Sequence, residues 1–152
     1  MAFELLKQDH RKVADLFSQA EQATTDKQKQ QLFEQIKAEL ENHTQIEETV
    51  LYPTLQKYEE LKDYVLEAIE EHRQVKTLLQ EIERLTNGSE KFDAKLKVMK
   101  ENVEHHVEEE EKEMFPDAQK TLSKDELSAL EQELETAKRS LQKKSSARSG
   151  NS

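Results

Sequence analysis

The sequence predicts an all-α protein, an up-down-up-down four-helix bundle with an additional C-terminal helix. The first reason is composition: of 152 residues, 34% are hydrophobic and 37% are charged, and the chain has only two glycines and two prolines. Such a mixture favours long amphipathic helices with narrow apolar stripes. The second reason is that apolar residues recur every three or four positions, which argues against the disorder that so polar a chain would otherwise suggest. The length suits one domain with a sizeable core.

Two predicted helices make up the first part of the chain, separated by a polar stretch at residues 24–26. The stripe of the first helix contains Phe3, Leu6, His10, Val13 and Phe17. The stripe of the second helix reaches an expected kink at Pro53. It contains Phe33, Ile36, Leu40, His43, Glu47 and Val50.

Two further helices are predicted between residues 61 and 116. The stripe of the third ends at a turn signal, Asn87–Gly88–Ser89. It contains Leu61, Val65, Ala68, His72, Val75, Leu79 and Ile82. The stripe of the fourth runs up to Pro116 and contains Phe92, Leu96, Met99, Val103, His106, Glu110 and Met114.

A fifth helix is expected after Ser123 and Glu126, which match a capping box. Its stripe carries no metal-ligating side chains, so we interpret it as a packing helix; the residues are Leu127, Leu130, Leu134, Ala137 and Leu141. The following tail is small and polar, which is typical of disorder. We therefore divide the chain into a four-helix bundle at residues 1–120, a C-terminal packing helix at 121–142 and a disordered tail at 143–152.

The first four helices form an internal repeat. The pattern His-Arg-x-Val-x-x-Leu begins at His10 and again at His72, 62 positions later. The pattern His-x-x-x-Glu-Glu begins at His43 and again at His106, 63 positions later, and each copy ends in an aromatic residue followed by proline. Short connections make neighbouring helices antiparallel, so two copies of one helical hairpin predict a four-helix bundle.

Four histidines and two glutamates interrupt the otherwise apolar stripes of this bundle. A polar side chain in such a position is costly unless it has a partner. A histidine and a glutamate four residues apart point the same way from consecutive turns, so each such pair can bind one centre. Imidazole and carboxylate together suit iron, manganese or zinc. The sequence therefore predicts a buried metal site made of His10, His43, Glu47, His72, His106 and Glu110, and the alternative is a set of hydrogen-bonded core histidines in a metal-free interaction module.

The acidic stretch at residues 101–116 offers two adjacent histidines and several glutamates, so its register must be decided. Val103 lies on the stripe, which selects His106, and the repeat independently selects Glu110. His105 is turned about 100° away. We expect His105 to be exposed; the alternative is that it is a metal ligand. The other glutamates are expected to face solvent or helix edges. We expect Glu48 and Glu111 to lie beside the site or to be exposed. Tyr52 and Phe115 are expected to pack at one end of the bundle.

The charge and the amino terminus restrict the cellular role. A net charge of −10 argues against a nucleic-acid or anionic-membrane partner. The chain has no cysteine, so neither disulfides nor thiolate metal sites are available. Residues 1–10 lack the apolar segment of a signal peptide, and no later run is long and apolar enough for a transmembrane helix. We therefore expect a cytoplasmic protein.

The order His, His-x-x-x-Glu, His, His-x-x-x-Glu-Glu, with Leu-Tyr-Pro and Met-Phe-Pro after the acids, resembles the hemerythrin HHE cation-binding domain over about residues 1–120. The Glu-x-x-His signature of ferritin-like bundles is absent. The resemblance implies two non-haem iron ions joined by an oxo or hydroxo bridge, with manganese or zinc as alternatives. It also implies that the terminal ligands are His10, His43, His72 and His106 and that the bridges are Glu47 and Glu110.

One departure from this family pattern bears on function. Oxygen-carrying hemerythrins have a second histidine four residues after that of the third helix, where this chain has Lys76. One iron would then have a vacant position, a water, or a glutamate or His105. This favours binding or sensing of O₂ or a related small oxidant, peroxide or nitric oxide, over reversible oxygen carriage. The alternatives are a peroxidase- or catalase-like enzyme and a protein of iron storage or iron sensing, and no catalytic residue or protein partner is assigned.

Overall fold

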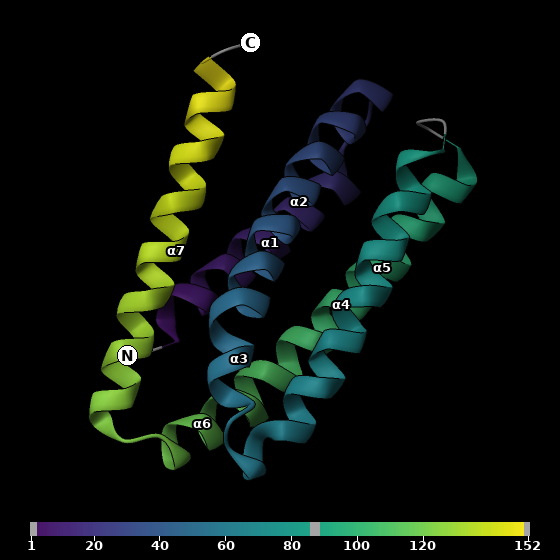
Figure 1. The fold of residues 1–152 in the computed structure, drawn as a ribbon. Coiled ribbons are helices and arrows are strands. Elements are labelled where there is room, and N and C mark those ends of the chain that lie inside the picture. Colours follow the sequence, from purple (N-terminus) through teal and green to yellow (C-terminus); the bar gives the residue numbers. More distant parts are fainter. Residues whose placement is uncertain (1–2, 86–88, 151–152) are drawn as a thin grey trace.

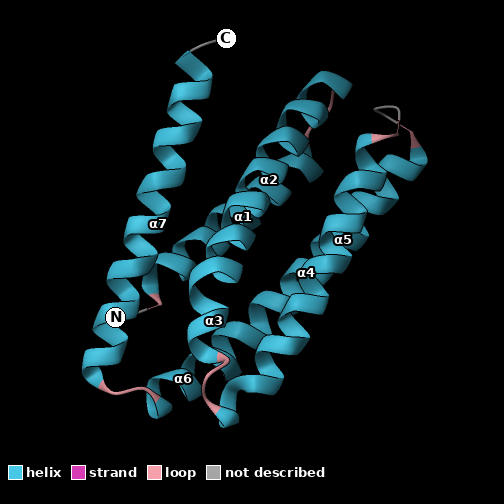
Figure 2. Ribbon diagram, in the orientation of Figure 1, coloured by secondary structure: helices cyan, strands magenta, loops and turns pink. Residues whose placement is uncertain are grey.

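Four long helices form the bundle, as the sequence predicts. In a computed structural model, residues 3–85 and 89–150 are described, residues 144–150 as backbone alone. The bundle helices are α1 (Glu4–Gln22), α2 (Asp26–Ile46), α4 (Lys62–Glu83) and α5 (Glu90–Glu109). Every regular element of the described residues is helical (Figure 2). The all-α prediction is confirmed, and α1 packs against α2 and α4 against α5 as two antiparallel hairpins (Figure 1).

Side-chain caps begin the second helix of each hairpin. The hydroxyl of Thr25 accepts a hydrogen bond from the backbone N–H of Gln28 at 3.2 Å, and the hydroxyl of Ser89 accepts one from the N–H of Phe92 at 3.0 Å. Each bond satisfies one of the N–H groups that a helix start leaves free. Asn87 and Gly88 of the predicted turn lie outside the described residues.

A widened turn precedes each proline. After α2, residues Glu47–Leu51 form a π-helical turn in which the N–H of Tyr52 donates to the carbonyl of Glu47, and helical backbone then continues as α3 (Tyr52–Leu55). The second hairpin repeats this arrangement with a π-helical turn over Glu110–Met114 before α6 (Phe115–Thr121). A proline ring in regular α-helix clashes with the carbonyl four residues back. The wider turn accommodates it, so Pro53 does not end the helix.

The hydrophobic core is divided into two clusters by a polar layer. The six predicted site residues lie between the clusters, because each stripe has apolar residues on both sides of its histidine: Leu6 and Val13 flank His10, for example. One cluster lies beside α3 and α6 and contains Leu51 and Leu55. The other contains Phe33 and Phe92, whose rings meet edge to face at 5.9 Å. Two rigid apolar blocks thus hold the polar layer in place.

The C-terminal helix α7 (Lys124–Gly150) packs against α2 and the turn that follows it. Its start is the predicted capping box: the N–H of Glu126 donates to Ser123 at 3.1 Å, and the N–H of Ser123 donates to Glu126 at 2.8 Å. Leu130 and Leu134 are buried in the cluster beside α3 and α6. The backbone is helical to Gly150, past residue 143; the division into bundle, packing helix and disordered tail stays a prediction.

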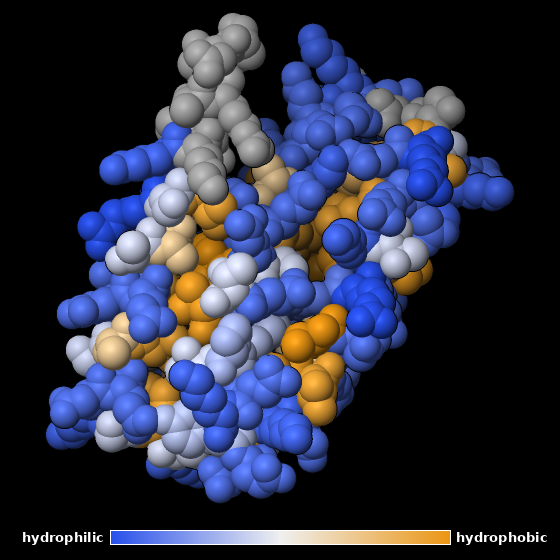
Figure 3. Space-filling view, viewed as in Figure 1, coloured by the Kyte–Doolittle hydropathy of each residue, from blue (hydrophilic) through white to orange (hydrophobic). Residues whose placement is uncertain are grey.

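The face drawn in Figure 3 is mostly hydrophilic. Hydrophobic residues appear on it in a band between α7 and α2 and in a hollow between α2 and the α4–α5 hairpin. In the part of the chain that the structure describes, no helix has the length and apolar character needed to cross a membrane.

Candidate metal centre

The six residues that the sequence singles out meet in one layer of the bundle. The histidines come one from each of the four bundle helices, and the two glutamates are the first residues of the two π-helical turns. All six are buried, with exposed fractions between 0% and 7%; they are His10, His43, Glu47, His72, His106 and Glu110. Their donor atoms form two overlapping groups, each with two histidines and both glutamates.

The first group joins α1 and α2. The Nε2 atoms of His10 and His43 lie 3.2 Å apart. His10 Nε2 is 3.2 Å from Oε1 of Glu110, and His43 Nε2 is 3.3 Å from Oε1 of Glu47. Four donor atoms within 4.8 Å of one another could hold one ion.

The second group joins α4 and α5 and uses the same two carboxylates. The Nε2 atoms of His72 and His106 lie 3.1 Å apart. His72 Nε2 is 3.0 Å from Oε1 of Glu47, and His106 Nε2 is 3.2 Å from Oε2 of Glu110. Since both glutamates reach both histidine pairs, each is placed to bridge two ions.

Each histidine ring is also held from behind by a carboxylate at its Nδ1 atom. Such a contact suits an N–H at Nδ1, which leaves the lone pair of Nε2 free for a metal and fixes the ring. The distances lie between 2.6 and 3.3 Å, and the pairs are His10 with Glu111, His43 with Asp9, His72 with Glu48 and His106 with Glu71. Glu48 and Glu111 therefore lie beside the site, one of the two positions expected for them.

Tyr52 brings a hydroxyl into the layer. Its O–H lies 2.7 Å from Oε2 of Glu110 and 3.1 Å from Oε1 of Glu47, where it can donate, and 3.1 Å from Nε2 of His72. The ring packs as expected, but the hydroxyl is a part of the site that sequence reasoning missed. The only signal for it was the repeated aromatic–proline pair, in which Phe115 is the counterpart of Tyr52 and stacks on Phe3 at 4.5 Å.

Charge is concentrated in this layer. Burial opposes ionisation of Glu47, but the histidines around it outweigh that effect and hold the pKa of its carboxyl well below the usual range. Burial likewise opposes a charge on His43, yet the carboxylates of Glu47 and Asp9 raise the pKa of its ring to about 10. The pKa of His106 is raised against burial by Glu110. The layer therefore favours the ionised form of Glu47, which binds a cation, and the charged forms of His43 and His106, each of which would give up a proton when a cation binds.

Two carboxylate oxygens in the layer lack a hydrogen-bond donor: Oε2 of Glu47 and Oε1 of Glu110. His10 comes within 3.2 Å of the second, but as a close polar contact without hydrogen-bond geometry. A buried acceptor without a partner costs about 1–3 kcal/mol, and a bound cation would supply one. With nitrogen and carboxylate donors, the residues present fit iron, manganese or zinc.

Two other residues considered in the sequence lie away from this layer. The side chain of His105 is 65% exposed and contacts Glu109 at 2.9 Å, within a separate, partly exposed group that includes Glu71. Lys76 is exposed and lines a groove between α2 and α4. Neither supplies a donor atom to the two buried groups.

A small cavity adjoins the histidines on the side of Phe33 and Phe92. Its volume is about 30 Å³, and apart from Thr44 and the histidines its lining is apolar: Val13, Leu40, Val75, Val103 and Val107. A single water needs about 10–15 Å³. The cavity is therefore large enough for a diatomic molecule or a peroxide and too small for an organic substrate.

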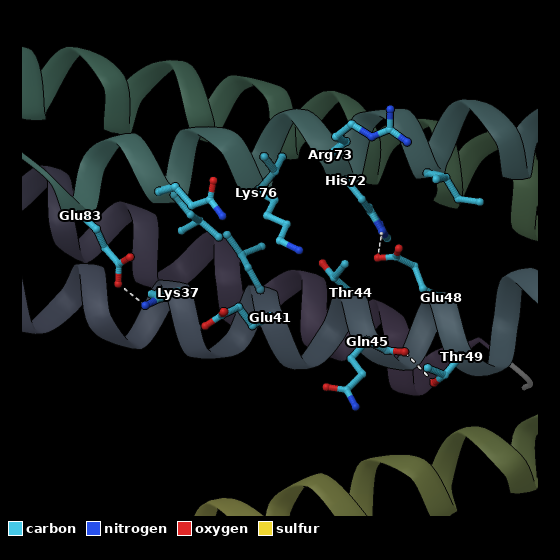
Figure 4. A pocket seen from close by; sticks show the side chains of 15 residues that line it. Lys37, Glu41, Thr44, Gln45, Glu48, Thr49, His72, Arg73, Lys76 and Glu83 are labelled. Carbon is cyan, nitrogen blue, oxygen red and sulfur yellow. Dashed lines mark hydrogen bonds and ion pairs between the residues drawn. The ribbon is translucent and has the colours of Figure 1, made fainter.

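A wider groove of about 620 Å³ between α2 and α4 adjoins this cavity. Thr44, His72, Leu40 and Val75 line both spaces. Figure 4 shows Thr44 and Lys76 pointing toward each other across the groove, next to the contact between His72 and Glu48. The groove thus leads from the surface to the edge of the histidine layer.

A family model for the hemerythrin HHE cation-binding domain matches residues 1–118. A crystal structure of a hemerythrin HHE cation-binding domain-containing protein from Mycobacterium kansasii is similar, with a TM-score of 0.78 and 25% identity over 91% of this chain and 85% of that one.

Two curated relatives are also similar. An uncharacterized hemerythrin-like protein of Schizosaccharomyces pombe is 30% identical over 78% of this chain, and a DNA nickase of Nostoc sp. is 28% identical over 93%. The chain spans 59% and 40% of the lengths of these two proteins, respectively.

Proposed function

This chain belongs to the hemerythrin HHE cation-binding family, and on that premise we propose that it holds two non-haem iron ions with which it binds or senses O₂ or a related small oxidant. The terminal ligands would be His10, His43, His72 and His106, and Glu47 and Glu110 would bridge. When bound, the two ions would supply vacant coordination positions and electrons for reaction with the oxidant.

The observation that carries this proposal is the apolar cavity of about 30 Å³ beside the four histidines. Apart from the histidines and Thr44, its lining consists of Leu40 and of valine side chains on three helices, which suits a small, weakly polar ligand. The groove between α2 and α4 provides its route from solvent. Lys76, where oxygen carriers of this family have a fifth histidine, leaves one ion with fewer imidazole ligands.

The other residues of the site bind, orient and hold protons. The carboxylates behind the histidines keep their rings aimed at the centre. Tyr52 holds a proton at its hydroxyl oxygen, 2.7 Å from Glu110. The two apolar clusters keep bulk water away from the layer, which limits side reactions of a bound oxidant with water.

The same hydroxyl favours a second candidate, peroxide decomposition, because that reaction needs a proton at the oxygen that leaves. Steady-state peroxide consumption by the iron-loaded protein tests it, and negligible turnover would exclude the enzyme. Iron storage or sensing is a third candidate, for which a chelator should strip the metal rapidly at neutral pH; slow loss would count against it.

The similarity to a DNA nickase does not carry that activity to this chain, which spans 40% of the length of that protein. A two-metal centre can cleave phosphodiesters, but the cavity beside the histidines is too small for a nucleotide, and the wider groove reaches only the edge of the histidine layer. The net charge of −10 also opposes approach to DNA.

The first experiment is elemental analysis of the purified protein together with its visible absorption spectrum. We expect about two irons per chain and an absorption band typical of a bridged di-iron centre, which reduction bleaches and O₂ or peroxide restores. A chain that stays free of metal after anaerobic loading with ferrous iron would refute the proposal. A loaded chain whose spectrum responds to no small oxidant would leave metal binding in place and exclude the sensing role.

A further inference from the structure

The C-terminal helix α7 reaches the candidate metal centre through one lysine. Lys138 Nζ donates to Oδ1 of Asp9 at 2.6 Å, and Oδ2 of Asp9 lies 3.3 Å from Nδ1 of His43. The contact links residue 138 to a ligand position in α2 by way of α1. The family model ends at residue 118, so this link comes from outside the matched domain.

Asp9 differs from the other three carboxylates that contact a histidine Nδ1 atom. Its side chain is 8% exposed, whereas those of Glu71, Glu111 and Glu48 are 16%, 32% and 42% exposed. The glutamates can therefore draw part of their solvation from water. A buried carboxylate depends on protein partners instead, and the partner of Asp9 on the side away from His43 is the ammonium of Lys138.

The packing of α7 fixes where this ammonium lies. Leu130 and Leu134 are buried, and Ala137 and Leu141 pack against the same cluster. Lys138 follows Leu134 by four residues, so it leaves the helix on the packed face. Its side chain is 29% exposed, with the charged end directed inward to Asp9. The leucines of α7 thus hold Lys138 in register with Asp9.

We propose that Lys138 is a positioning residue of the metal centre. It holds the carboxylate of Asp9, Asp9 holds the ring of His43, and the cation bound by His10 and His43 is retained more tightly as a result. Among the described side chains of α7, none makes a hydrogen bond or ion pair with His72, with His106 or with the carboxylates behind them, so we expect the cation of that pair to be unaffected. This inference rests on the proposed metal binding and assigns to α7 a role beyond packing.

The test compares metal retention in the full chain and its Lys138→Met variant. Both are loaded anaerobically with two equivalents of ferrous iron and then mixed with an excess of chelator, and release is followed by the absorbance of the chelate. Changes behind a metal ligand typically weaken metal binding about 10- to 100-fold. We expect one equivalent to leave about tenfold faster in the variant and the other at the wild-type rate.

Three further variants make the result specific. Asp9→Asn should accelerate the same single equivalent, and the double variant should add nothing, because both changes break one chain of contacts. Lys138→Arg keeps the charge and should restore much of the retention. Arg139→Met removes a positive charge from the exposed neighbour on α7, whose partner is Glu135 at 3.8 Å, and should release metal as the wild type does.

Unchanged release from Lys138→Met, equal acceleration of both equivalents, or the same acceleration in Arg139→Met would each overturn the inference. The melting temperature of the metal-free variant separates positioning from general stability: we expect it within a few degrees of wild type, and collapse of the fold would show a structural role instead. Metal uptake by the wild-type chain is measured in the same experiment. If the wild type takes up no metal, the proposed function itself is refuted.

Discussion

At the scale of single residues, the centre depends on which side chains face the layer and which only neighbour it. Glu109 and Glu110 are adjacent in sequence, yet Glu110 is 1% exposed and touches two histidines, whereas Glu109 pairs with the exposed His105. Adjacent positions on a helix point about 100° apart. Substitutions at the two positions should therefore differ sharply in effect.

The first prediction uses this pair. Glu110→Gln should lose at least one of two bound irons, because a neutral amide is a poor bridge between cations. Glu109→Gln should keep both and is the matched control. The measurement is the number of irons per chain in the two variants after removal of loosely bound metal. Two irons per chain in Glu110→Gln would show that the bridging assignment is wrong.

A second prediction concerns Tyr52. Its hydroxyl faces two carboxylates that share a buried layer, so Tyr52→Phe should destabilise the metal-free protein by about 1–3 kcal/mol. Denaturant unfolding of the metal-free form measures this. Tyr64→Phe is the comparison, because Tyr64 donates to Asp117 at 2.6 Å near the surface and its loss should cost less. Equal losses for the two variants would contradict the buried role.

At the scale of elements, the π-helical turns decide which residues reach the layer. In regular α-helix a residue five positions on lies about 140° away from the first. A π-helical turn closes five residues apart instead, which brings Tyr52 back over Glu47 on the same side of the helix. Regular α-helical periodicity predicts only that the ring of Tyr52 packs at the bundle end, and the contact of its hydroxyl with the site follows from the π-helical turn.

The third prediction belongs to the groove between α2 and α4. Thr44 lines both the groove and the cavity beside the histidines. Thr44→Phe should fill this junction and slow the reaction of the reduced, iron-loaded protein with O₂ at least severalfold, without reducing its iron content. Stopped-flow absorbance measures the rate. Thr49→Phe, which alters the groove away from the cavity, should react at the wild-type rate; equal slowing would locate the route elsewhere.

At the scale of the whole molecule, metal binding and folding should be coupled. The layer gathers ionised groups between two apolar clusters, and a ligand bound only to the folded state stabilises it by about 4 kcal/mol at a concentration 1,000 times its Kd. For a chain of this size, each kcal/mol of free energy of unfolding shifts the melting temperature by about 2–4 °C. Removal of iron should therefore lower the melting temperature by about 10 °C, as calorimetry can measure, and an unchanged value would contradict the coupling.

Much of the fold and the site could be predicted because both depend on the spacing of residue types along the chain. Stripes at helical period, the turn signal that ends in Ser89 and the capping box at Ser123 depend only on residues close in sequence, and the hairpin repeat shows in a comparison of two segments of the chain. Since an α-helix presents every third or fourth residue to the same side, the stripes also identified the six residues that now lie together. Their role as metal ligands stays a prediction that the iron analysis tests.

The sequence by itself therefore determined the helices and the composition of the polar layer, which follow from periodicity within single elements, and the bundle, which follows from the hairpin repeat and its short connections. Only the tertiary structure decided how the layer is supported. The four Nδ1 contacts, the reach of Tyr52 to both glutamates and the contact of Lys138 with Asp9, 129 positions away, all join different elements or depend on a departure from α-helical geometry. Such contacts are fixed by packing in three dimensions, and no spacing along the chain specifies them.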